Sequence, residues 1–120
     1  MKKITFVGTG YVGLVGGAGI SEFGHQVTCA DIDQNKIERL KAGEIPIYEP
    51  GLESLVKQNV AKGRLHFSHD VPKSIQNANI IFVAVGTPQR SNGEANLSAI
   101  ESVAKTIGEN LNGYKVICTK

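Results

Sequence analysis

The chain has 120 residues, which is enough for one hydrophobic core and corresponds to a single domain. About 41% of the residues are hydrophobic and 20% are charged, as in ordinary soluble globular domains. The net charge is +2 and the basic residues are scattered, so the clustered positive charge of nucleic-acid-binding proteins is missing. We therefore expect no nucleic-acid partner.

The N-terminal segment admits two interpretations, a secretory signal or a buried strand followed by a turn. Two lysines precede a run of uncharged residues over positions 4–20, which is the order of charge and apolarity in a signal peptide. This run is broken by threonine, tyrosine and repeated glycine, and no small-x-small cleavage site closes it. It is also too short to span a membrane. We therefore reject the secretory interpretation and expect no membrane partner.

Apolar runs and helical patterns alternate along the chain. In chain order they predict strand 3–7, helix 11–23, strand 27–31, helix 34–42, a helix from about 50 to 63, strand 64–68, helix 71–76, strand 80–85, helix 97–111 and strand 115–119. Gly24 and Gly43 are expected to end helices, and Asp33 is expected to cap one. Pro46 and Pro50 hold the residues before them extended, so they predict a shaped connector ahead of the third helix.

This alternation is typical of βαβ units and predicts an α/β fold, a Rossmann-type doubly wound parallel sheet of strand order 3-2-1-4-5. In that order Cys29 and Cys118 lie in strands three positions apart, so they cannot form a disulfide. Neither cysteine has the spacing of a metal site, and a reducing, cytoplasmic setting fits best. The chain ends on a strand, from which we expect a fragment of a longer protein.

The turn after the first strand carries the pattern Gly8-x-Gly10-x-x-Gly13, which is common in nucleotide-binding proteins. Gly8 permits the tight turn, Gly10 lets a pyrophosphate approach the backbone, and Gly13 allows the helix to pack closely. A glycine-rich turn without a ligand is the alternative. The glycines at 16, 17 and 19 add to the helix and imply close packing against neighbouring backbone, with no ligand role assigned.

Asp31 ends the second strand, 18 residues beyond Gly13. A carboxylate there can accept hydrogen bonds from both hydroxyls of an adenosine ribose, and it repels a 2′-phosphate, so NAD is preferred over NADP. Lys36 is close enough in sequence to reach the ribose or the adenine edge. The alternatives are a strand-end carboxylate that caps a turn and a solvated lysine.

The segment Val85-Gly86-Thr87-Pro88 follows the fourth strand at the same carboxyl edge, beside the switch point between the first and fourth strands. Gly86 permits close approach of the chain to a ligand, and Thr87 offers a hydroxyl and an amide. A generic turn is the alternative here. The three histidines form no constellation with a nucleophile, so no catalytic role is assigned to them.

Four motifs in this order, G-x-G-Y-V-G-L, D-I-D-x-x-K-I, P-I-Y-E-P-G-L and V-G-T-P, resemble the N-terminal domain of UDP-glucose 6-dehydrogenases and, more broadly, the UDP-glucose/GDP-mannose dehydrogenase family. The likeness covers the whole chain. It implies that Tyr11 and Val12 lie on the phosphate-binding turn, that Asp31 and Lys36 contact the adenosine ribose, and that Thr87 contacts the cofactor. The resemblance assigns no catalytic role to Glu49.

The family oxidises the C6 alcohol of a sugar nucleotide to a carboxylate with two NAD, through a cysteine thioester. The resemblance therefore implies the NAD-binding part, residues 1–120, of an enzyme that converts UDP-glucose to UDP-glucuronate, with a UDP-sugar substrate and a homodimer formed through a central helix. The family's catalytic residues correspond to positions beyond Lys120, so no catalytic residue and no metal site is expected within the chain, which alone should be inactive.

Two alternative functions stay open at this point. Within the family, dehydrogenases of GDP-mannose and of UDP-N-acetylmannosamine share much of the motif set. In another class, regulatory NAD-sensing modules share the glycine turn and the acidic residue. Such modules do not call for the P-I-Y-E-P-G-L connector or for V-G-T-P with a long polar loop, which favours the dehydrogenase.

Overall fold

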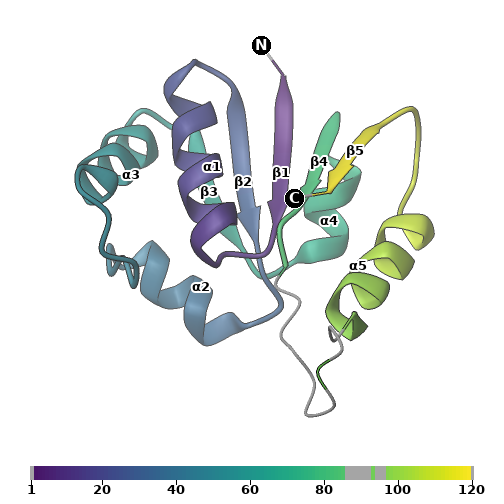
Figure 1. Ribbon diagram of the computed structural model, residues 1–120. Helices are drawn as coiled ribbons and strands as arrows, with labels where there is room; N and C mark the ends of the chain where they lie inside the picture. The colour runs from purple at the N-terminus through teal and green to yellow at the C-terminus, as the bar shows by residue number, and fades with distance from the viewer. Residues whose placement is uncertain (1, 86–92, 94–96, 120) are drawn as a thin grey trace.

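The computed structural model describes residues 2–85, 93 and 97–119, and its centre is a five-stranded sheet (Figure 1). The strands lie in the order β3-β2-β1-β4-β5, and each neighbouring pair is parallel. This confirms the predicted fold class and strand order. The strands are β1 (Lys3–Val7), β2 (Gln26–Ala30), β3 (Leu65–Ser68), β4 (Ile80–Val83) and β5 (Val116–Thr119).

Five helices in the described residues cover the two faces of the sheet. They are α1 (Tyr11–Glu22), α2 (Gln34–Lys41), α3 (Leu52–Ala61), α4 (Val71–Gln76) and α5 (Ser98–Glu109). Figure 1 shows α1, α2 and α3 on one side of the sheet and α4 and α5 on the other. Within the described ranges, none of them combines the length and the apolar character that a membrane crossing requires.

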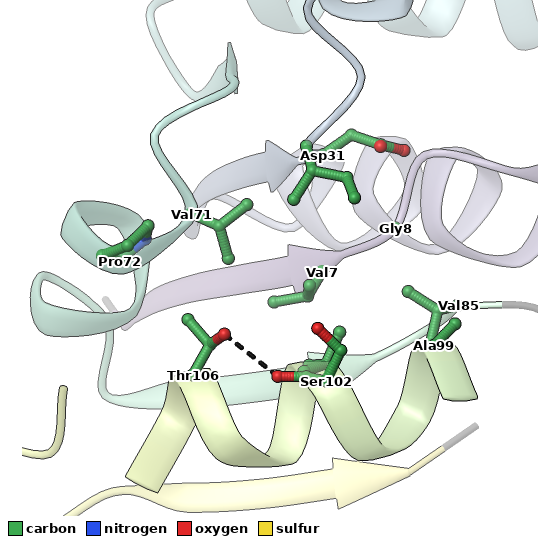
Figure 2. A pocket seen from close by; sticks show the side chains of 11 residues that line it. Val7, Gly8, Asp31, Val71, Pro72, Val85, Ala99, Ser102 and Thr106 are labelled. Atoms are coloured by element: carbon green, nitrogen blue, oxygen red, sulfur yellow. Dashed lines mark hydrogen bonds between the residues drawn. The ribbon is translucent and has the colours of Figure 1, made fainter. Parts of the chain in front are cut away.

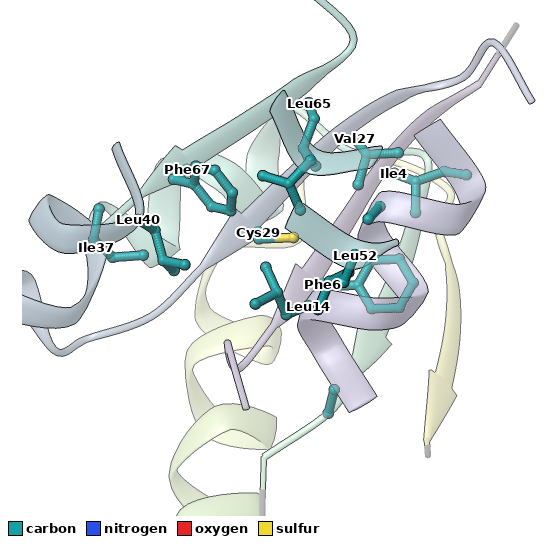
Figure 3. Packing of buried hydrophobic residues seen from close by; sticks show 13 residues of the cluster. Ile4, Phe6, Leu14, Val27, Cys29, Ile37, Leu40, Leu52, Leu65 and Phe67 are labelled. Carbon is teal, nitrogen blue, oxygen red and sulfur yellow. The ribbon is translucent and has the colours of Figure 1, made fainter. Parts of the chain in front are cut away.

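The core is divided between the two faces because side chains alternate along each strand. In β1, Ile4 and Phe6 join the cluster under α1, α2 and α3, whereas Val7 joins the cluster under α4 and α5. Figure 3 shows the first cluster, in which Leu14 of α1 and Leu52 of α3 pack over the strands. The central strand β1 is therefore buried on both faces, as expected for a parallel strand inside a sheet.

The glycine-rich helix α1 packs closely on this first cluster. A Cβ atom at Gly16 would lie 2.8 Å from the Phe6 ring, and one at Gly17 would lie 2.5 Å from the Sγ of Cys29. A Cβ at Gly19 would meet no heavy atom of the described residues within 4 Å, apart from its own helix. The expected packing against backbone is therefore wrong at these positions, because the strands present side chains to Gly16 and Gly17, and Gly19 faces open space.

Helix α5 is less buried than its apolar pattern predicts. Of its residues only Ile107 is fully buried, and the flanking Leu97 and Leu111 are 46% and 50% exposed. The reason is that α5 lies over β4 and β5 at the margin of the described sheet, where Val116 and Ile117 of β5 are themselves 43% and 47% exposed. One side of α5 borders a cavity beside Asp31 instead of core.

Candidate dinucleotide site at the carboxyl edge of the sheet

The turn between β1 and α1 lies between the ends of β2 and β4. Gly8 has φ +110°, and its N–H donates to the carbonyl of Ala30 at 2.7 Å. A Cβ at Gly8 would lie only 2.7 Å from the carbonyl oxygen of Ala84. Glycine is required here both by the backbone conformation and by the close approach of the chain that follows β4. The turn thus occupies the switch point of the sheet, where ligands of open α/β folds bind.

The first turn of α1 keeps its amide donors free of side-chain partners. The N-cap is Gly10, no side chain caps the helix, and its first turn contains no acidic residue. Among the described residues, no atom beyond its chain neighbours and its own helix lies within 4 Å of the position of a Cβ at Gly10, whereas a Cβ at Gly13 would collide with the carbonyl oxygen of Gly8. The helix therefore starts tightly against the turn and leaves space above its N-terminus, an arrangement suited to an anion.

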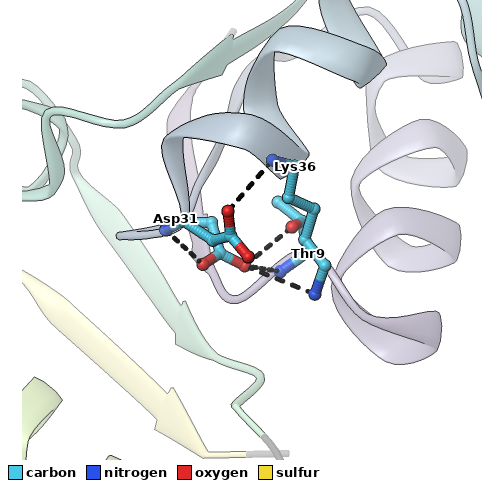
Figure 4. A network of polar contacts seen from close by, with 4 residues as sticks. Thr9, Asp31 and Lys36 are labelled. Atoms are coloured by element: carbon cyan, nitrogen blue, oxygen red, sulfur yellow. Dashed lines mark hydrogen bonds and ion pairs between the residues drawn. The ribbon is translucent and has the colours of Figure 1, made fainter.

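Asp31 joins this turn to the start of α2 (Figure 4). Its Oδ2 accepts hydrogen bonds from the N–H of Thr9 at 3.0 Å and from the hydroxyl of Thr9 at 2.7 Å. Its Oδ1 accepts the N–H of Asp33 at 3.0 Å, and the Nζ of Lys36 lies 3.9 Å from Oδ2. One carboxylate thus holds two loops together at the carboxyl edge.

These contacts change the acidity of Asp31. Partial burial raises the pKa of the carboxyl, but the hydrogen bonds from Asp33 and Thr9, with a smaller contribution from the charge of Lys36, outweigh it. The net result is a pKa below the ordinary value of 3.8. The group is therefore an anion at neutral pH and a hydrogen-bond acceptor only.

A cavity of about 280 Å³ opens beside Asp31 on the face covered by α4 and α5. Figure 2 shows α5 side chains facing Val7 of β1 and Val71 of α4 across this cavity. Its lining is mainly apolar, with Asp31 as the charged residue. It is formed by Val7, Gly8, Asp31, Ile32, Val71, Pro72, Val85, Ala99, Ser102, Val103 and Thr106. A flat, mostly apolar group next to a carboxylate fits this description.

The structure brings together several of the predicted site residues. Gly8, Asp31 and Val85 line the same cavity, and Lys36 lies beside Asp31. The side chains of Tyr11 and Val12 lie on the first turn of α1 and are 54% and 44% exposed.

Gly86, Thr87 and Pro88 lie outside the described residues. Their assignment to the cofactor therefore stays a prediction.

Sequence reasoning missed several contacts of this site. Thr9 was treated as a variable position of the glycine motif, yet it supplies two of the hydrogen bonds to Asp31. Its burial signals this role, since a threonine that is 1% exposed needs a hydrogen-bond partner. The α5 side of the cavity was also missed, although Ala99, Ser102 and Thr106 form a stripe of small side chains at helical spacing.

The connector before α3 also reaches the turn. The hydroxyl of Tyr11 donates to Oε2 of Glu49 at 3.1 Å, and this hydrogen bond and the negative charge of Glu49 raise the pKa of Tyr11 above its ordinary value of 10.0. The contact is exposed to solvent. It links the start of α1 to the connector of residues 45–51, and this connector also lines a second hollow of about 370 Å³.

Comparison with known proteins identifies the family of the chain. Residues 2–120 match the model of the NAD binding domain of the UDP-glucose/GDP-mannose dehydrogenase family. The chain has 57% sequence identity to UDP-glucose 6-dehydrogenase TuaD of Bacillus subtilis, in an alignment that covers the whole chain and 26% of that protein. It has 39% sequence identity to a UDP-glucose 6-dehydrogenase of Pseudomonas aeruginosa, in an alignment that covers 98% of the chain and 26% of that protein.

Solved structures give the same result. A GDP-mannose dehydrogenase of Pseudomonas aeruginosa superposes with a TM-score of 0.92 at 35% identity, covering 99% of this chain and 28% of that one. A UDP-glucose dehydrogenase of Pyrobaculum islandicum superposes with a TM-score of 0.87 at 36% sequence identity, covering 92% of this chain and 26% of that one. The chain thus spans about a quarter of the length of these relatives. It belongs to the UDP-glucose/GDP-mannose dehydrogenase family and represents its NAD binding domain.

Proposed function

We propose that the carboxyl edge of the sheet binds NAD through the turn at the start of α1, the end of β2 and the segment after β4. The residues assigned to this site are Gly8, Gly10, Tyr11, Val12, Gly13, Asp31, Lys36, Val85, Gly86, Thr87 and Pro88. The observation that carries the proposal is that an uncapped helix N-terminus, an ionised carboxylate and an apolar cavity lie side by side at one switch point.

Each part of the site suits one part of the dinucleotide. The free amides of the first turn of α1 receive the pyrophosphate, and the open space at Gly10 lets it approach. Asp31 accepts a hydrogen bond from the adenosine ribose, and Lys36 lies next to it. The cavity beyond Asp31 takes the adenine ring. NAD, when bound, supplies the acceptor for a hydride from the substrate.

An NAD titration of the chain, followed by amide chemical shifts, tests this assignment. Asp31→Ala removes the ribose acceptor and should weaken NAD affinity by about tenfold or more, the effect of losing a charge-assisted hydrogen bond. Asp33→Ala is the matched control, because this neighbouring carboxylate caps α2 and is not assigned to the ligand. Equal NAD affinity in Asp31→Ala and the wild type would contradict the assignment.

For the protein as a whole we propose the activity of a UDP-glucose 6-dehydrogenase, the oxidation of UDP-glucose to UDP-glucuronate with two NAD. Support comes from relatives with this name at 57%, 52% and 50% identity over nearly the whole chain. In this proposal residues 1–120 form the N-terminal NAD-binding domain of a cytoplasmic homodimer. The second candidate is a GDP-mannose dehydrogenase, which the TM-score of 0.92 to such an enzyme favours.

A steady-state assay distinguishes the two candidates. The protein that carries this domain together with a substrate domain, as in the relatives, is supplied with NAD and with UDP-glucose, GDP-mannose or UDP-N-acetylmannosamine in turn. We expect turnover with UDP-glucose and the release of two NADH for each sugar oxidised. Turnover with GDP-mannose alone would replace the proposed substrate, and absence of turnover with all three would favour a regulatory NAD-binding module.

A further inference from the structure

We infer that Thr9 is a positioning residue for the cofactor, because its hydroxyl holds the carboxylate of Asp31 in the orientation that receives the adenosine ribose. This inference rests on the proposed role of Asp31 in NAD binding. The glycine motif itself leaves the residue between its first two glycines unspecified. In this chain that residue is a buried threonine with a defined polar partner.

Thr9 makes two hydrogen bonds to one oxygen of Asp31. Its N–H and its hydroxyl both donate to Oδ2 of Asp31, at 3.0 and 2.7 Å. The hydroxyl contact has the short length typical of a hydrogen bond to a charged acceptor. Thr9 is 1% exposed, so water cannot replace its hydroxyl without opening the turn. The position of the carboxylate is therefore set by the turn and not by solvent.

The remaining acceptor capacity of Asp31 is limited, which makes this orientation decisive. A carboxylate offers about four lone-pair positions. Thr9 uses two on Oδ2, and the N–H of Asp33 uses one on Oδ1. A position for a ribose hydroxyl is therefore left on Oδ1, and Asp31 lines the cavity together with Ile32. Because Thr9 donates twice to Oδ2, it determines which part of the carboxylate the ribose meets.

Few charges compete with this arrangement. Among the described residues, Lys36 is the cation recorded beside the carboxylate, at 3.9 Å from Oδ2. The carboxylate of Asp33, on the same loop, faces the N–H of Lys36 as the cap of α2. The lining contributed by β1, α4, α5 and the end of β4 is uncharged. Removing the hydroxyl of Thr9 therefore takes away the shortest contact to Asp31 without introducing a new charge.

A double-mutant cycle with NAD as the probe tests the inference. Thr9→Val keeps the shape of the side chain and removes the hydroxyl, and Thr9→Ser keeps the hydroxyl. We expect NAD affinity to fall about threefold to tenfold in Thr9→Val and to stay within about twofold of the wild type in Thr9→Ser. In the Asp31→Ala background, Thr9→Val should cause no further loss, because no carboxylate is left to position.

The outcomes separate this inference from the proposed function. If Asp31→Ala binds NAD like the wild type, the proposed function of Asp31 fails and the positioning role fails with it. If Asp31→Ala weakens binding but Thr9→Val does not, or weakens it equally in both backgrounds, only the positioning role is overturned. Equal losses in Thr9→Ser and Thr9→Val would also overturn it, because the hydroxyl would then be irrelevant.

A measurement without ligand supports the cycle. Carbon-13 titration of the Asp31 carboxyl should show a higher pKa in Thr9→Val than in the wild type, and Thr9→Ser should restore the lower value. Thr9→Ala serves the same purpose if the valine variant does not fold. An unchanged pKa in the variants that lack the hydroxyl would contradict the inference whatever the NAD affinities are.

Discussion

The N-termini of α1 and α2 both follow the ends of strands at the carboxyl edge, but only α2 has a side-chain cap. In α2 the side chain of Asp33 accepts the N–H of Lys36, and in α4 the side chain of Asp70 accepts the N–H of Lys73. The helix α1 starts instead at Gly10 and has neither a side-chain cap nor an acidic residue in its first turn. Among the five helices in the described ranges, it alone lacks both.

This difference separates a helix end that a side chain caps from one that side chains leave uncapped, as the proposed pyrophosphate site requires. An aspartate at the N-cap typically stabilises a helix by about 1 kcal/mol relative to alanine but by only a few tenths of a kcal/mol relative to glycine, so α1 with Gly10 at its N-cap forgoes a small contribution. Its tight start depends instead on Gly8 and Gly13, which bring the turn and the helix into direct contact. The uncapped end is thus stabilised by packing below it, and the amides above it stay available to a pyrophosphate.

The largest expected effect comes from breaking that packing. In Gly13→Ala the added Cβ collides with the carbonyl oxygen of Gly8, so the turn must open. We expect a loss of about 1–3 kcal/mol in the free energy of unfolding and no measurable NAD binding. Urea unfolding and an NAD titration measure the two effects. Gly19→Ala is the control, because its Cβ meets no neighbouring element in the described part of the chain, and it should stabilise α1 by up to about 1 kcal/mol.

A second change makes α1 resemble α2. Gly10 has φ −75°, and the described residues leave room for a Cβ there, so Gly10→Asp can adopt the N-cap conformation and cap its own helix. The free energy of unfolding should rise by a few tenths of a kcal/mol, while NAD affinity falls about tenfold or more because the carboxylate occupies the anion site. Gly10→Ala, which adds no charge, should lose less affinity. A variant that binds NAD as tightly as the wild type would show that α1 does not receive the pyrophosphate.

The converse change removes a cap where no ligand is proposed. Asp33→Ala and Asp70→Ala should each lower the free energy of unfolding by about 1 kcal/mol, because an amide at the start of α2 or α4 loses its partner. NAD affinity should stay within about twofold in both. Thermal unfolding and the same NAD titration check the pair, and a large loss of affinity in Asp70→Ala would mean that α4 takes part in the site.

The smallest expected effect is a loss of the stability contributed by Asp31 as the pH falls. The pKa of Asp31 is lower in the folded chain than its ordinary value of 3.8. Asp31 therefore contributes stability that is fully present above pH 3.8 and is lost as the pH falls through the lower, folded pKa. Urea unfolding of the wild type and of Asp31→Asn should show a stability gap at pH 5 that narrows toward pH 3. A gap that widens in acid would reverse the sign of the shift.

The general architecture could be read from the sequence, because it depends on local patterns. Alternating runs, glycine helix ends and right-handed crossovers predicted the strand order that the structure confirms. The predicted cap at Asp33 is confirmed as well. These features involve residues close together in the chain or follow from the handedness of the crossovers.

The polar contacts of the candidate site were not predictable in the same way. The Thr9–Asp31 hydrogen bonds join residues 22 positions apart, and the Tyr11–Glu49 contact joins residues 38 positions apart. Their partners depend on how the loops pack at the carboxyl edge, which no local period encodes. The close neighbours of Gly16 and Gly17 were misjudged for the same reason, since they belong to β1 and β2.

The burial of Cys29 beneath Gly17 has a chemical consequence for following the opening of this domain. Burial raises the pKa of the Cys29 thiol to about 12, and its side chain has no exposed surface. Alkylating reagents attack the thiolate, so Cys29 reacts only when α1 separates from β2. Cys118 in β5 is partly exposed and unpaired, and it provides an early reference signal in the same molecule. The alkylation rate of Cys29, measured relative to that of Cys118 in the same molecule, therefore reports how often α1 separates from the sheet.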